Sequence, residues 1–253
     1  MPPLSVVIIT YNEERNIGRC LESVKGIADE IVVVDSLSTD RTQEICRTYG
    51  ARVVEHPFEG HIAQKNYAIS QAEYPHQLSL DADEALSEEL RREIIRIKHH
   101  WQQAGYTMNR LSNYCGRWIR HSGWYPDTKL RLYDSRKGQW TGLDPHDRFE
   151  LHEGETAHLN GDLLHYTYYT IEQHILQANK FSTIAANALI KSGKRATLLQ
   201  VLIKPAAKFI RNYVINLGFM DGAYGFTICR ITAFETFLKY FKAWHIRRSA
   251  GEE

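Results

Sequence analysis

Eight residues decide how this chain folds: Gln77-Leu78-Ser79-Leu80-Asp81-Ala82-Asp83-Glu84. Leu78 and Leu80 alternate with polar residues, which predicts the end of a short strand. On extended backbone, the carboxylates of Asp81 and Asp83 point to the same side and repel each other. A hard cation such as Mg²⁺ or Mn²⁺ relieves that repulsion, so the pattern indicates a metal–diphosphate site. The plainer alternative is an acidic turn before a helix capped by Ser87.

Buried strands alternate with helices through the first hundred residues. Strand-length apolar runs lie at 4–9 and 31–34, a third short strand is expected at 52–55, and the 78–80 strand follows them. Helical patterns occupy the intervals between these strands, and Gly26 and Gly50 are suited to end the first two helices. This spacing predicts an open parallel sheet with helices on both faces.

Ligands bind such sheets beyond the carboxyl ends of the strands. Polar residues follow three of the predicted strands, at 10–13, 35–36 and 81–83. Asp35 is suited to accept hydrogen bonds from a base or a ribose, and Lys65 to reach a phosphate. Taken singly, Asp35 fits a turn and Lys65 a solvated helix face. Together the signals at this edge predict a nucleotide site, although neither a dinucleotide fingerprint nor a P-loop is present.

The motifs at 5–13, 34–42, 64–66 and 81–84 resemble glycosyltransferase family 2. Within that family, the chain most resembles the lipopolysaccharide core β-1,4-glucosyltransferase subfamily. The resemblance implies an α/β fold of the GT-A type, a nucleotide-sugar donor, a divalent metal (Mg²⁺ or Mn²⁺) and inversion at the anomeric carbon.

Specific residues acquire roles from this resemblance. The residues that would hold the nucleotide are Thr10, Tyr11, Glu13 and Asp35. Lys65 would lie near the diphosphate, Asp81 would approach the ribose and Asp83 the metal. The family also carries a His-Tyr pair similar to His165-Tyr166. His165 would then complete the metal shell or touch the diphosphate, unless it is an ordinary packed histidine.

Transfer with inversion needs a carboxylate that takes the proton from the acceptor hydroxyl. Asp147, in an expected loop at 140–150, is the candidate base, with Asp144 and Glu150 as alternatives. The metal would stabilise the departing diphosphate.

A second loop, at 123–127, carries the expected acceptor contacts, which are Trp124, Tyr125 and Asp127. Its two aromatic rings would stack on a sugar or act as a lid; the alternative is ordinary loop packing.

The C-terminal part is helical in pattern and strongly basic. Residues 189–248 hold eleven Lys or Arg and two acids, a net charge of +9 against +1 for the whole chain. Basic helices with large aromatics favour an anionic membrane surface. The alternative is a helical hairpin packed on the catalytic domain. Nucleic acid is the least favoured partner for this basic segment, because the sequence contains no nucleic-acid-binding motif.

The expected domains are a GT-A catalytic domain at 1–169 and a basic amphipathic helical segment at 170–253. Within the first, residues 1–100 would form the nucleotide-sugar and metal half, and 101–169 the acceptor and base half. The four scattered cysteines fit reduced thiols in a cytosolic protein. No signal peptide is expected, because the first residues lead directly into a strand pattern.

We therefore expect an inverting, metal-dependent hexosyltransferase on the cytoplasmic face of a bacterial inner membrane. It would move a hexose, glucose from UDP-glucose, onto a lipid-linked saccharide such as the lipopolysaccharide inner core. One alternative is a sugar nucleotidyltransferase, although no Gly-rich loop lies near the first strand. The other is a non-catalytic module that binds a saccharide or lipid.

Overall fold

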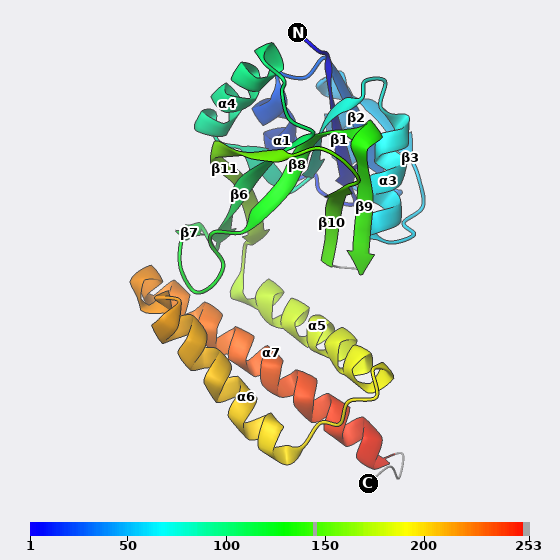
Figure 1. Ribbon diagram of the computed structural model, residues 1–253. Coiled ribbons are helices and arrows are strands. Elements are labelled where there is room, and N and C mark those ends of the chain that lie inside the picture. Colours follow the sequence, from blue (N-terminus) through cyan, green and yellow to red (C-terminus); the bar gives the residue numbers. More distant parts are fainter. Residues whose placement is uncertain (144–145, 250–253) are drawn as a thin grey trace. The chain divides into compact units, whose positions relative to one another are not determined.

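The computed structural model describes residues 1–143 and 146–249 and divides into two compact units (Figure 1). The first unit comprises residues 1–111 and 127–166, and the second comprises 112–126 and 167–253. Strands β6 (Gly105–Tyr114) and β11 (Thr156–Tyr168) begin in the first unit and end in the second. Each unit has a hydrophobic core of its own.

Four parallel strands form one half of the sheet in the first unit. Their order is β3 (Arg52–Glu55), β2 (Glu30–Asp35), β1 (Leu4–Thr10) and β4 (His76–Asp81). The helices between them are α1 (Ile17–Val24), α2 (Thr42–Thr48) and α3 (His61–Gln71).

Alternating side chains of β1 enter two separate cores. Val6 and Ile8 pack in the core that α1 and α4 (Glu88–His99) cover, whereas Val7 packs with Ala68 of α3. Helices therefore cover both faces of the sheet (Figure 1). The predicted α/β fold of the GT-A type is confirmed.

The other half of the sheet is antiparallel. Strand β4 pairs with β8 (Thr128–Asp134), and β6, β11 and the short β5 (Glu84–Leu86) follow in that order. Because β5 starts directly after the turn at 82–83, the acidic stretch lies where β4 and β5 meet. A 3-10 turn (Ser135–Lys137) follows β8.

The prediction of a loop at 140–150 is wrong. Residues on both sides of 144–145 form two paired strands, β9 (Gly138–Leu143) and β10 (His146–Leu151). Trp140 and Phe149 are register partners, and the Phe149 ring stacks on Tyr133 with centroids 3.6 Å apart. Burial of these rings stabilises the pairing. Since side chains alternate along a strand, Asp147 shares the face of Phe149 and Glu150 takes the opposite face.

Three long helices dominate the second unit: α5 (Ile171–Lys191), α6 (Leu198–Ile210) and α7 (Gly222–Ser249). Helix α7 lies between the other two and packs against both (Figure 1). Thr170 and Thr197 form capping boxes at the N-termini of α5 and α6. This unit also contains β7 (Arg117–Ile119), a π-helical turn (Arg211–Ile215) and a 3-10 turn (Gly218–Asp221). Within the described residues, no helix has the length and hydropathy to cross a bilayer.

Candidate active site

A single buried ammonium joins the end of β4 to β10. Lys65 of α3 is only 3% exposed, and its Nζ lies 2.7 Å from Asp147 Oδ2 and 3.0 Å from Asp81 Oδ1. The ring centroid of Trp140 lies 4.5 Å from the same Nζ. The structure therefore brings the candidate base, the expected diphosphate lysine and the first acid of the D-x-D pattern into one cluster.

Sequence reasoning missed a second buried cation in this cluster, Arg131 of β8. Its Nη2 lies 2.8 Å from Asp81 Oδ2 and 2.9 Å from Glu84 Oε1. The backbone N–H of Asp81 also donates to Glu84 Oε2 at 3.0 Å. The one available signal was an arginine between Leu130 and Leu132 in an alternating strand. That pattern predicts the strand, but it does not identify the acids with which Arg131 forms ion pairs.

The charge of Asp81 is fixed by these two cations. Burial alone would raise the pKa of Asp81, but Arg131 and Lys65 outweigh that effect and hold its pKa well below the ordinary value of 3.8. Asp81 is therefore a carboxylate at neutral pH, and its counter-charges come from the chain itself.

The second acid of the pattern has a different partner. Asp83 Oδ2 lies 3.2 Å from His165 Nε2, and the Asp83 carbonyl accepts from the Tyr166 N–H at 2.9 Å. Strand β11 is in register with β5 at this point, with His165 opposite Glu84. A carboxylate oxygen and an imidazole nitrogen are both ligands for divalent cations. In the described part of the chain, no three or more His, Cys, Asp or Glu side chains lie together in a group that could hold a metal ion.

The end of β1 contributes polar groups of different character. Within the residues that the structure describes, the buried Thr10 Oγ1 has no hydrogen-bond partner. Tyr11 is 58% exposed. Glu13 accepts from Asn16 Nδ2 at 2.7 Å, and burial together with the nearby Asp83 raises the pKa of Glu13. An unpaired buried hydroxyl and an exposed ring at a strand end are suited to contact a ligand.

Asp35 lies beside Thr10, its register partner on β2, and is fully buried. Its Oδ1 accepts from the Ser38 N–H at 2.8 Å and from Gln43 Nε2 at 2.7 Å, and the Ser38 hydroxyl donates to Oδ2. These contacts show that Asp35 holds the loop after β2, which agrees with the alternative that it belongs to a turn. The contact of Asp35 with a nucleotide stays a prediction.

The expected acceptor residues divide between the units. Trp124 belongs to the second unit and packs edge-on against Tyr114, with centroids 5.8 Å apart. Tyr125 also belongs to the second unit. Asp127 belongs to the first, where its Oδ2 lies 2.8 Å from Arg110 Nη2. Their acceptor roles stay predictions.

The two alternatives to Asp147 differ from it in position. Glu150 Oε1 lies 2.5 Å from Arg148 Nη2, and the two side chains are 44% and 67% exposed. Asp144 lies outside the described residues. Of the two carboxylates that are described on β10, Asp147 is the one in contact with Lys65.

Comparisons with known proteins agree on a family. A family model described as glycosyl transferase family 2 matches residues 5–152. The lipopolysaccharide core biosynthesis glycosyltransferase LpsC of Rhizobium meliloti is 30% identical, over 96% of this chain and 92% of that protein. An uncharacterized glycosyltransferase of Rickettsia typhi is 34% identical, over 96% of this chain and 87% of its own length.

Among solved structures, residues 1–349 of Staphylococcus aureus TarS in complex with UDP give a TM-score of 0.49 at 16% identity, covering 98% of this chain and 92% of that chain. The family model spans more than half of the chain, and the LpsC match extends over nearly all of it. The resemblance seen in the strand-end motifs is confirmed, and the chain belongs to glycosyl transferase family 2.

Proposed function

We propose that this chain is a metal-dependent, inverting glycosyltransferase that moves a hexose from a nucleotide sugar to a lipid-linked saccharide. The observation that carries the proposal is the contact of the Lys65 ammonium with both Asp147 and Asp81. That contact supports Asp147 as the base, because it keeps a carboxylate beside the sheet edge at which α/β proteins bind nucleotides.

The proposed reaction is a single displacement at the anomeric carbon. The oxygen of the acceptor hydroxyl bonds to the anomeric carbon while Asp147 takes the proton of that hydroxyl. The nucleoside diphosphate leaves from the opposite face of the anomeric carbon. Lys65 orients Asp147 by donating to Oδ2 at 2.7 Å. Arg131 holds Asp81 in place from the other side at 2.8 Å. Rigid placement of the reacting groups is itself a large part of catalysis.

Asp83 and His165 are the residues that would hold a divalent cation, Mg²⁺ or Mn²⁺. Their facing oxygen and nitrogen fit such an ion, and substrate phosphate and water would complete its shell, as is usual for Mg²⁺. When bound, the ion would supply positive charge that stabilises the leaving diphosphate.

The similarity to LpsC supports a saccharide of the lipopolysaccharide core as acceptor, and within it we favour the inner core. UDP-glucose is the donor that we favour. The basic helices of the second unit would meet the membrane that carries the acceptor.

Nucleotide release from UDP-, GDP- and ADP-hexoses, with inner-core lipopolysaccharide as acceptor, tests this proposal. We expect turnover with the UDP-hexose in Mn²⁺, loss of turnover in EDTA, and recovery when Mn²⁺ is restored. Asp83→Ala should abolish turnover without unfolding the protein, whereas Glu89→Ala, an exposed acid on α4, should retain it. Full turnover by Asp83→Ala, or equal rates in EDTA, would contradict the metal role.

A further inference from the structure

The outward side of α6 is apolar. Five of its large side chains are more than half exposed, namely Leu198, Leu199, Leu202, Ile203 and Ile210. At 3.6 residues per turn they fall on one half of the helix, and the buried residue of α6, Val201, lies on the other half. Single exposed leucines are ordinary in soluble proteins, but a continuous apolar helix face marks a surface that meets an apolar partner.

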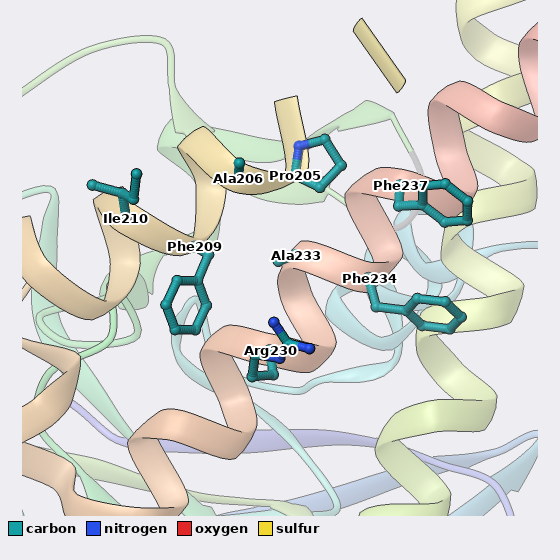
Figure 2. A pocket seen from close by; sticks show the side chains of 8 residues that line it. All are labelled: Pro205, Ala206, Phe209, Ile210, Arg230, Ala233, Phe234 and Phe237. Carbon is teal, nitrogen blue, oxygen red and sulfur yellow. The ribbon is translucent and has the colours of Figure 1, made fainter. Parts of the chain in front are cut away.

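A groove of about 530 Å³ lies between α6 and α7 (Figure 2). Ile210 belongs both to the groove and to the outward face of α6. The rings of Phe209, Phe234 and Phe237 line the groove, and Arg230 is the charged residue in its lining. The Arg230 guanidinium carbon lies 5.9 Å from the Phe209 ring centroid. A groove of this composition suits a molecule with an apolar chain and an anionic group.

Positive charge lies at Arg230 in the groove and on the half of α6 that carries Val201. Lys204, Arg211 and Arg230 are exposed, whereas residues 189–248 contain only two acids. One of these acids, Asp221, accepts from the His121 N–H at 3.0 Å and from Ser122 Oγ at 3.1 Å. The excess positive charge favours an anionic occupant. It disfavours a second copy of this chain, because the same face of that copy would carry the same charge.

We propose that the apolar face of α6 and the α6–α7 groove form a docking site for an anionic phospholipid bilayer. The apolar side chains of α6 enter the boundary between headgroups and acyl chains. Lys204 and Arg211, on the half of α6 that carries Val201, add to the positive field that attracts the anionic surface. The groove receives one acyl chain, with Arg230 at the phosphate of that lipid. Apolar burial and electrostatic attraction both contribute to such binding. The inference rests on the proposed function, since an enzyme acting on a lipid-linked saccharide works at a lipid surface.

Vesicle flotation of the full chain tests the docking site. We expect binding to phosphatidylglycerol–phosphatidylcholine vesicles, weaker binding at high salt because ions screen the charges, and little binding to pure phosphatidylcholine. The combined change Leu199→Ser, Leu202→Ser and Ile203→Ser should weaken binding by about tenfold or more. Lys204→Gln with Arg211→Gln should weaken binding and flatten its salt dependence. The matched control is Leu176→Ser, a 62% exposed leucine on α5, which should bind like the wild type.

Occupancy of the groove has its own readout. Phe234→Trp adds a fluorophore to the groove lining, and lipids with brominated acyl chains should quench the added fluorescence. The docking site is refuted if the wild type ignores anionic vesicles at low salt, or if the triple serine variant binds as well as the wild type. If the wild type is a dimer in solution and the triple serine variant is a monomer, the apolar face of α6 binds a second copy of this chain. That result would overturn the proposal.

Nucleotide-sugar turnover without vesicles separates this proposal from the proposed function. The triple serine variant should keep wild-type hydrolysis of the donor, because none of its changes touches the candidate active site. Vesicle binding by a chain that turns over no nucleotide sugar would refute the proposed function and leave the docking site standing.

Discussion

Asp147→Asn should lower kcat by about 10²–10⁴-fold, because an amide cannot take the proton from the acceptor hydroxyl. The amide keeps the size of the side chain, and its oxygen still accepts from Lys65 Nζ, which lies 2.7 Å from Asp147 Oδ2. The loss should therefore appear in kcat, with the KM for the donor changed little. Steady-state transfer from UDP-glucose to an inner-core acceptor measures both constants.

Glu150→Gln is the matched control for this change. Glu150 lies on the same strand, β10, but on the opposite face, where it pairs with Arg148. We expect nearly wild-type kcat from Glu150→Gln. If Asp147→Asn keeps most of its kcat while Glu150→Gln loses it, Glu150 is the base and the assignment made here is wrong.

Arg131→Met should destabilise the first unit by about 3–5 kcal/mol, because it takes a main counter-charge from the buried Glu84 and from the partly buried Asp81. Arg131 is 3% exposed and contacts both Asp81 and Glu84. Methionine retains most of the packing volume, so the expected loss comes mainly from charge. Urea denaturation at pH 7, followed by circular dichroism, measures the change in free energy of unfolding.

Arg41→Met is the control, since Arg41 forms an ion pair with Glu44 in which both side chains are exposed. Exposed pairs contribute little, so its urea midpoint should stay near that of the wild type. Equal midpoints for Arg131→Met and Arg41→Met would mean that the buried network does not support the fold.

The pH dependence of stability gives a second readout of the same network. The pKa of Asp81 is lowered in the folded chain, so its contribution to stability is present above the unfolded value, near 3.8, and is lost as the pH falls through the folded pKa. In Arg131→Met the largest cause of that lowering is absent. The variant should therefore lose less additional stability than the wild type as the pH falls below about 4.

The sheet could be predicted because its information is local. The segments at 4–9, 31–34, 52–55 and 78–80 each show a strand pattern, and the helical patterns in the intervals predict the crossovers that parallel strands need. The polar residues that follow these strands were then expected at one edge. The register of β1 with β2 and β4 aligns Thr10 with Asp35 and Ile9 with Asp81.

The partners within the site could not be predicted, because they depend on pairings between distant segments. Arg131 meets Asp81 only because β8 joins the sheet beside β4, a contact across fifty positions of sequence. The β9–β10 pairing was missed because the glycine, proline and acids at 142–147 read as a loop. It is the packing of Trp140 and Phe149 around Tyr133 that favours paired strands there.

A thermal-shift titration of the wild-type chain with UDP, in Mn²⁺ and in EDTA, tests the central claim that the strand-end acids form a metal-dependent nucleotide-sugar site. A ligand that binds only the native state stabilises it by about 2.7 kcal/mol at a concentration 100 times its Kd. We predict a higher Tm with UDP in Mn²⁺, no shift in EDTA, and smaller shifts with GDP, ADP or CMP. The absence of any shift with these nucleotides in Mn²⁺, or an equal UDP shift in EDTA, would contradict the claim.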